Sequence, residues 1–322
     1  MRRKRVAVLC ASLMAASLVA GGCGNGTAGT DGTQTAETTQ TDNKSDDGTI
    51  SLTVWGAEED ADLLKQITDS FEKEYASQAK FDITITAETE SNCKDDLLGD
   101  VLNSADVFTF ADDQLRALVA AGVLEPIENS NEIASASVDG AADAASVNDQ
   151  LYAYPLTADN GYFMYYNKEY FSDSDVQTLD QMLSVAAANG KKVSMDWSSG
   201  WYVYSFFGNT GMEVGLNDDG ISNYCTWNSQ DGSIKGVDVA QSMLSIAASP
   251  GFLNTDDEGM MEGIQNGTVI AGVSGVWNAN DIEQAWGDNY AAVKLPTYTC
   301  AGQQVQMASF KGYKLVGANA YS

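Results

Sequence analysis

The chain has 322 residues, enough for two domains, since a single hydrophobic core stops growing at about 250–300 residues. Its 45 acidic and 17 basic residues give a formal net charge of −28, which argues against nucleic acid or an anionic membrane as a partner. It has no histidine, which excludes Ser-His and Cys-His nucleophile pairs and histidine-ligated zinc and makes catalysis less expected.

The N-terminus has the features of a secretory signal peptide over residues 1–22. Four basic residues at 2–5 precede an apolar run at 6–20, and small residues then lead to Cys23. A cysteine directly after small residues resembles a bacterial lipobox, so Cys23 is the expected lipid attachment, with cleavage without lipid as the alternative. Residues 23–49 are polar and predict a flexible linker, which would tether the protein to the extracellular face of the cell membrane.

The next segment predicts a doubly wound sheet. Apolar residues alternate at 50–54 and again at 81–85, and a short apolar strand follows at 106–110. Helical spacing at 63–75, 95–102 and 115–121 separates and follows these strands. The order β-α-β-α-β-α predicts an α/β fold with a mostly parallel sheet, whose strand ends share one rim.

Aromatic and acidic residues follow the ends of these strands. A ring can stack on a sugar face, and carboxylates accept hydrogen bonds from hydroxyls. Two alternatives stay open: Phe110 can belong to the core with its aspartates capping a helix, and the acids at 58–60 can stabilise a helix start. The candidate residues here are Trp55, Glu58, Glu59, Phe110, Asp112 and Asp113.

The second half repeats the pattern. A crossing into a second lobe is expected at 157–161, where Asp159 lies. Trp201 and Tyr202 follow a strand at 193–195 together with Asp196, and Trp277 ends an apolar strand at 267–276. Such groups in two lobes predict a cleft that binds a neutral saccharide.

The three remaining cysteines, Cys93, Cys225 and Cys300, are widely spaced and include no C-x-x-C pair, so free or buried thiols are expected rather than disulfides. No cofactor and no metal is expected. The acidic loops at 217–220 and 255–258 could hold calcium, but they lack a regular ligand spacing and are interpreted as solvated turns.

A series of short motifs is similar to the bacterial extracellular solute-binding lipoproteins of ABC sugar importers, in the maltose-binding-protein-like group. The resemblance runs from residue 50 to residue 322. It rests on DVFTFADDQ at 106–114, GVLEP at 122–126, YP at 154–155, YNK at 166–168, GVW at 275–277, LPT at 295–297 and FKGYKLVGANAYS at 310–322.

The resemblance implies a periplasmic-binding-protein-like (type II) two-lobe fold that closes about a hinge. Lobe 1 would comprise residues 50–157 with 293–322 returning to it, and lobe 2 residues 158–292. The hinge segments would lie near 157–160 and 293–296. Family members continue beyond this point for several helices, so the chain is expected to be a truncated one that lacks the C-terminal helices.

The resemblance also implies roles for residues. Phe110 and Trp277 take the places of stacking rings, Asp113 and Asp159 those of hydroxyl-binding carboxylates, and Phe310 is a further expected ligand contact. Gln114 stands where the best-known member has a basic sugar contact, and Asp159 is shorter than the glutamate expected there.

The implied function is that of a monomeric, non-enzymatic binding component. It would capture oligosaccharides, with maltodextrins expected, and deliver them to a membrane permease. Two rival functions stay open, a secreted glycoside hydrolase, which also pairs rings with carboxylates, and a carbohydrate sensor or adhesion lipoprotein of the same fold.

Overall fold

The computed structural model describes residues 48–218 and 222–322. The expected signal peptide, the lipobox cysteine Cys23 and residues 23–47 of the expected linker lie outside this part of the chain. In the described part, no helix has both the length and the apolar character needed to cross a membrane. Cys93, Cys225 and Cys300 are free thiols, as predicted, and Cys93 and Cys300 are buried.

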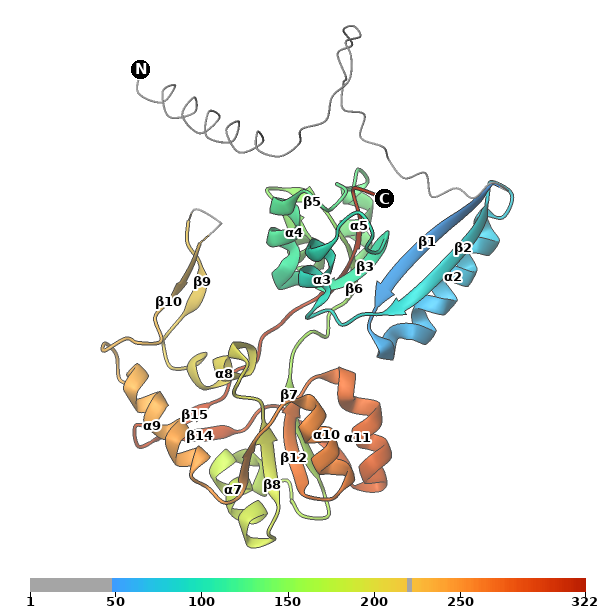
Figure 1. Ribbon diagram of the computed structural model, residues 1–322. Coiled ribbons are helices and arrows are strands. Elements are labelled where there is room, and N and C mark those ends of the chain that lie inside the picture. The colour runs from blue at the N-terminus through green and yellow to red at the C-terminus, as the bar shows by residue number, and fades with distance from the viewer. Residues whose placement is uncertain (1–47, 219–221) are drawn as a thin grey trace, which may run out of the picture. The chain divides into compact units, whose positions relative to one another are not determined.

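The first lobe is built on a five-stranded sheet with the strand order β2-β1-β3-β16-β6 (Figure 1). The three strands predicted from the sequence pair in parallel, and β16 runs antiparallel to both of its neighbours. The strands are β1 (Thr49–Gly56), β2 (Lys80–Ala87), β3 (Val107–Ala111), β6 (Tyr154–Thr157) and β16 (Lys314–Ala318). The parallel strands therefore end at one rim, where β16 begins.

Helices and short turns join the strands of this lobe. Its hydrophobic core includes Leu97, Phe108, Leu118 and Leu315. The helix after β3 ends at Gly122, whose φ of 71° is one that glycine adopts at little cost. The elements are η1 (Glu58–Asp60), α2 (Ala61–Tyr75), α3 (Cys93–Gly99), η2 (Asp112–Gln114), α4 (Leu115–Ala121), α5 (Ser130–Ala136), α6 (Ala141–Ala144), β4 (Ser146–Val147) and β5 (Gln150–Leu151).

The second lobe is built on a second five-stranded sheet, with the order β11-β8-β12-β7-β13. Consecutive residues of β7 enter different cores, because side chains alternate across a strand. Met164 and Tyr166 lie in a core formed with the helices α7 (Leu179–Ala188), α8 (Gly200–Phe207) and α9 (Gly236–Ala247). Tyr165 lies in another core, with residues of α10 (Asp257–Gln265) and α11 (Ala279–Trp286). The strands are β7 (Phe163–Asn167), β8 (Lys192–Met195), β11 (Phe252–Asn254), β12 (Val269–Ser274) and β13 (Tyr290–Val293).

The remaining elements of this lobe are helices and two hairpins. The Thr178 side chain accepts a hydrogen bond from the Gln181 N–H at 3.2 Å and so caps α7, as its sequence indicates. The elements are η3 (Asp175–Gln177), α7 (Leu179–Ala188), α8 (Gly200–Phe207), β9 (Val214–Leu216), β10 (Asn223–Cys225), α9 (Gly236–Ala247), α10 (Asp257–Gln265), η4 (Val276–Asn278), α11 (Ala279–Trp286), η5 (Gly287–Asn289), β14 (Thr297–Cys300) and β15 (Gln303–Gln306).

The chain crosses to the second lobe between β6 and β7 and returns to the first lobe after the hairpin β14–β15. Residues 293–322 were expected in the first lobe, with a hinge segment at 293–296. Instead the hairpin β14–β15 packs on the second lobe, because Tyr298 and Cys300 are fully buried in its core. The return runs through residues 307–313 to β16, and the two crossings lie side by side, since the Asn160 N–H donates to the Gly312 carbonyl at 3.2 Å.

Candidate functional site

A cavity of about 800 Å³ is lined by residues of both lobes. From the first lobe it receives the residues that follow the parallel strands: Glu58 and Glu59 after β1, Glu90 after β2, and Asp113 after β3. Lys314, the first residue of β16, completes this wall. The rim where parallel strands end therefore forms one wall of the cavity, as the strand order predicts.

The second lobe contributes the aromatic wall. Trp201 and Tyr202 lie in the first turn of α8, Trp277 lies on η4, and Asp257 begins α10. Asn278, Asn280 and Asp281 also line the cavity. Rings on one wall and carboxylates on the other can bind the apolar face and the hydroxyls of a sugar.

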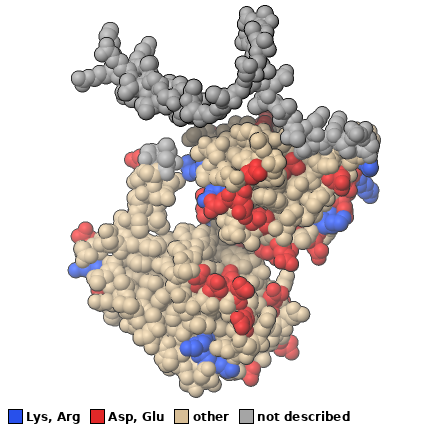
Figure 2. All heavy atoms as spheres, viewed as in Figure 1, with Lys and Arg blue, Asp and Glu red and all other residues tan. Residues whose placement is uncertain are grey.

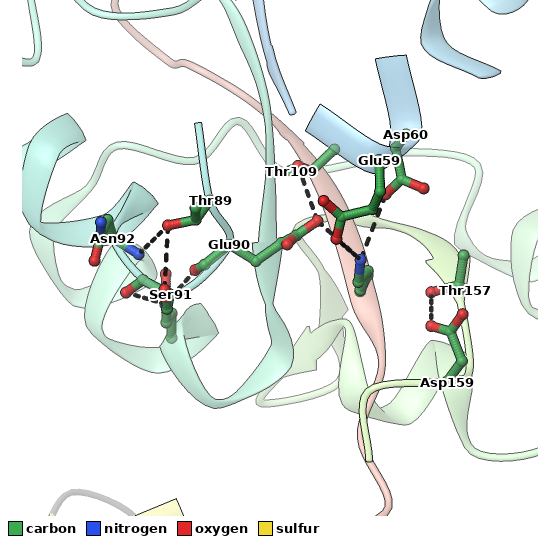
Figure 3. A network of polar contacts seen from close by, with 11 residues as sticks. Glu59, Asp60, Thr89, Glu90, Ser91, Asn92, Thr109, Thr157 and Asp159 are labelled. Atoms are coloured by element: carbon green, nitrogen blue, oxygen red, sulfur yellow. Dashed lines mark hydrogen bonds and ion pairs between the residues drawn. The ribbon is translucent and has the colours of Figure 1, made fainter. Parts of the chain in front are cut away.

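A buried lysine organises the carboxylates of the first wall (Figure 3). Lys314 is only 4% exposed, and its Nζ lies 3.5 Å from a Glu59 oxygen, 3.4 Å from an Asp60 oxygen and 3.4 Å from a Glu90 oxygen. Burial alone would lower the pKa of Lys314, but Glu90, Asp60 and Glu59 outweigh it and raise the pKa above its usual value. Lys314 therefore stays charged, and its single charge faces three carboxylates.

The turn after β2 is fixed by hydrogen bonds as well as by Lys314. The buried Gln114 side chain donates to the main-chain carbonyls of Glu90 at 2.6 Å and Ser91 at 3.1 Å, and accepts from the Lys94 N–H at 3.2 Å. Thr109 donates to the Glu90 carboxylate at 3.5 Å. Gln114 thus braces the turn, and it also lines the cavity.

The environment also affects the protonation of the first wall. Burial is the largest influence on Glu90 and raises its pKa, although Lys314 opposes the shift. The Asp113 residue is exposed to solvent, but the protein around its carboxyl group still desolvates it in part, and this desolvation raises its pKa too. These carboxyl groups bind a proton more readily than ordinary ones.

On the second wall, Asp257 holds the ring of Trp277. Its carboxylate accepts hydrogen bonds from the Trp277 Nε1–H at 2.7 Å and the Ser274 hydroxyl at 3.0 Å, and the Tyr202 hydroxyl lies 3.4 Å away. Burial raises the pKa of Asp257, and the three donors lower it by a smaller amount. The expectation of a solvated turn at 255–258 was wrong for Asp257, which is tied to three other segments of its lobe.

Six of the eleven expected ligand residues line the cavity. Their positions agree with the prediction that rings and acids converge from both lobes. The six are Glu58, Glu59, Asp113, Trp201, Tyr202 and Trp277. The cavity lining does not include the other five.

Phe110 is wrong as a ligand contact. It is 0% exposed, packs beside Phe108 with a ring distance of 5.6 Å, and lies in the core of the first lobe. Both edges of its strand β3 are paired, with β1 and β16, and side chains on both faces of the strand, Phe108, Thr109 and Phe110, are buried, so the alternative of a core residue holds. Trp55 is partly buried against the same core. Asp112 is half-buried, next to Asp113 in the sequence, and is not among the residues that line the cavity.

Asp159 and Phe310 also lie outside the lining. Asp159 is hydrogen-bonded to the Thr157 hydroxyl, and its neighbour Asn160 lines the cavity instead. The ring of Phe310 stacks on Trp201 at 4.5 Å and on Tyr204 at 4.0 Å. Phe310 therefore supports a ring that lines the cavity without lining it.

The sequence interpretation missed Glu90, Lys314 and Asp257. Glu90 follows a predicted strand, but no aromatic residue stands beside it to draw attention to it. Lys314 begins an antiparallel strand, so the rule of looking after strand ends does not find it. Asp257 follows β11, which has only three residues and was not predicted.

Comparison with known proteins places these features in a family. The model of a family described as bacterial extracellular solute-binding protein matches residues 66–321. The chain belongs to this family. Among curated members, it is similar to the galactooligosaccharide-binding protein of Bacillus subtilis (strain 168), with 25% identity over 287 residues, and to the maltodextrin-binding protein MdxE of the same organism, with 24% over 292 residues.

These alignments cover 84% of this solute-binding protein but 65% and 66% of the two relatives, so the chain spans about two thirds of their length. Among solved structures, one determined with acarbose has a TM-score of 0.76 and 28% identity over 85% of this chain and 72% of that one. The maltodextrin-binding protein MalE1 from L. casei BL23 has a TM-score of 0.67, with 24% identity over 84% and 70%. The expected periplasmic-binding-protein-like two-lobe fold is confirmed.

Proposed function

We propose that this protein is the substrate-binding component of an ABC importer and that it captures neutral oligosaccharides in the cavity lined by both lobes. The observation that carries the proposal is the pairing of the two walls, with Trp201 and Trp277 on one and Glu59, Glu90 and Asp113 on the other. The cavity volume of about 800 Å³ falls in the usual range for small-molecule sites, roughly 300–1,000 Å³.

The charge of the lining favours a neutral ligand. Six carboxylates line the cavity, and Lys314 is the basic residue among its lining residues. The ammonium of Lys314 already faces three carboxylates, so an anionic saccharide would meet net negative charge. Figure 2 shows acidic side chains gathered on the face of the first lobe in view. The acidic residues of the lining are Glu58, Glu59, Glu90, Asp113, Asp257 and Asp281.

We infer that the ligand is an oligosaccharide of the maltooligosaccharide class. The names of the relatives support an oligosaccharide, since one is a galactooligosaccharide-binding protein and the other a maltodextrin-binding protein, and the similar structure with 28% identity was solved with acarbose. The maltodextrins expected from the motif resemblance in the sequence favour the glucose series over the galactose series.

Capture would occur by closure of the lobes about the crossings at 158–162 and 307–313. A ligand that contacts both walls stabilises the closed state by the difference between its affinities for the two states. The closed protein would then dock on a membrane permease. In the same proposal, the protein is a monomer anchored through a lipid on Cys23 at the extracellular face of the membrane.

Calorimetric titration with maltotetraose, a β-linked galactooligosaccharide and an acidic oligosaccharide of similar length tests this proposal. We expect saturable binding of maltotetraose, weaker binding of the galactooligosaccharide and no binding of the acidic one. An assay for new reducing ends in the maltotetraose sample should stay negative. Preferred binding of the acidic oligosaccharide, or the release of reducing ends, would contradict the proposal.

A further inference from the structure

Lys314 occupies a central position in the first wall. It is the first residue of β16 and pairs with Ala111 of β3 on one side and with Thr157 of β6 on the other. Because β16 runs against the parallel strands, its first residue lies at the rim where those strands end. The return crossing from the second lobe thus leads directly into this residue.

The ammonium of Lys314 joins two segments that are distant in the sequence. Glu59 and Asp60 belong to η1 after β1, and Glu90 belongs to the turn after β2. Their side chains are 36%, 19% and 13% exposed, whereas that of Lys314 is 5% exposed. Three carboxylates this close would repel one another without the cation between them.

The other charged groups near this cluster are mostly acidic, with Lys94 as a basic one, which lowers the pKa of Asp113. Asp112 and Asp113 follow Ala111 on η2, and Asp159 follows Thr157, where it bonds to the threonine hydroxyl. Burial raises the pKa of Glu90, and Lys314 is the first opposing influence. Removal of the cation would therefore favour protonation of Glu90.

We propose that Lys314 is a positioning residue of the ligand site, which gathers Glu59 and Glu90 on one wall as charged acceptors for ligand hydroxyls. This inference rests on the proposed function, because it assigns those hydroxyls to an oligosaccharide. If Lys314 had a purely structural role, it would support the fold without affecting the charge state of Glu90. The two roles differ in how binding depends on pH.

The experiment compares Lys314→Met with Lys65→Met, Lys314→Arg and the double variant Lys314→Met/Glu90→Gln. Lys65 is a matched control, since it lies on α2 of the same lobe, is exposed, and forms an ion pair with Asp69 of the same helix. The double variant removes one charge of each sign and so leaves the net charge of the cluster unchanged. It can therefore be measured in place of the single variant if the single variant does not fold. Lys314→Arg keeps the positive charge.

The ligand-free arm measures hydrogen exchange. We expect faster exchange in residues 57–60 and 88–93 of Lys314→Met, unchanged exchange in α10, and no change in Lys65→Met. Unchanged exchange at 57–60 and 88–93 would overturn the inference. This arm needs no ligand, so it tests whether Lys314 holds these two segments even if the wild type binds no sugar, which would overturn the proposed function alone. The pH dependence of binding then separates a positioning residue from a structural brace.

The ligand arm measures the dissociation constant for maltotetraose from about pH 5 to about pH 8. We expect Lys314→Met to bind about tenfold more weakly than the wild type near neutral pH. Its affinity should rise with pH as Glu90 loses its proton, over a higher pH range than in the wild type, where Lys314 opposes the rise in the pKa of Glu90. Lys314→Arg should retain most of the affinity. The double variant should bind weakly without the new pH dependence, because Glu90 is gone and Glu59 is no longer held.

Three results in this arm would contradict the inference. One is a Lys314→Met variant that binds maltotetraose as tightly as the wild type does. Another is a loss of affinity with no change in pH dependence, which indicates a structural brace. Wild-type affinity in the double variant would likewise show that Lys314 only neutralises Glu90.

Discussion

Replacement of Trp277 by alanine tests the aromatic wall of the cleft. The side chain lines the cavity and is partly buried against the core of the second lobe, and its Nε1–H donates to Asp257 at 2.7 Å. Trp277→Ala removes the ring surface available to a sugar and also a donor to a half-buried carboxylate. The first loss affects binding, and the second affects the stability of the fold.

The two effects differ in size and in what measures them. Stacking of a base on an aromatic ring is worth about 1–3 kcal/mol, and a sugar should fall at the low end, so we expect a loss of about 1–2 kcal/mol, or roughly five- to thirtyfold in Kd. Loss of the donor to Asp257 should lower the free energy of unfolding by about 1–3 kcal/mol. Calorimetric titration with maltotetraose measures the first, and urea unfolding the second.

A matched control separates binding from folding. Trp227 is also partly buried against the core of the second lobe, where it stacks on Phe207 at 4.2 Å, but it does not line the cavity. Trp227→Ala should lower stability and leave the affinity of the folded protein unchanged. If Trp277→Ala binds maltotetraose within about twofold of the wild type, Trp277 does not contact the ligand and the reasoning about this wall is refuted.

Three further predictions follow from other contacts. Gly275→Ala should weaken binding several-fold and also lower Tm, because a Cβ at Gly275 would lie 2.0 Å from an atom of the Trp277 ring and displace the ring together with its donor to Asp257; unchanged affinity in titration would show that the ring can move without consequence. Phe110→Leu should lower Tm, since Phe110 is fully buried in the first core, but should leave the Kd for maltotetraose unchanged, and a selective loss of affinity would return Phe110 to the site. Acidification from neutral pH to about pH 5 should raise Tm in calorimetry. Burial raises the pKa values of Glu90, Asp113 and Asp257, so the folded state binds protons above the usual carboxyl pKa of about 4, and stability falls as pH rises through the raised values. A Tm that decreases steadily over this acidification would contradict the assignment of these shifts.

The pattern of apolar residues was enough to predict the three parallel strands of the first lobe and the rim at which they end. Phe110 shows where this reasoning reaches its limit. A central strand is buried on both faces, so the sequence does not show whether its last aromatic residue packs in the core or contacts a ligand. The same ambiguity affected Trp55, whose ring packs against the first core.

Residues that meet across long sequence separations were harder to predict. Lys314 and Glu90 come together only because β16 inserts antiparallel beside β3, and a local pattern does not contain that pairing. The hairpin β14–β15 was assigned to the first lobe because the family resemblance implied a hinge segment near 293–296. Its alternating residues Tyr298, Cys300 and Val305 are buried in the second core, a preference that periodicity shows but does not assign to either lobe.

The most direct test of the central claim is a calorimetric titration of the purified wild-type protein with maltotetraose. The account predicts saturable binding of one maltotetraose per chain, because a single cavity carries both the rings and the carboxylates that we assign to the ligand. No saturable heat from a folded sample, with either maltotetraose or a galactooligosaccharide, would contradict it.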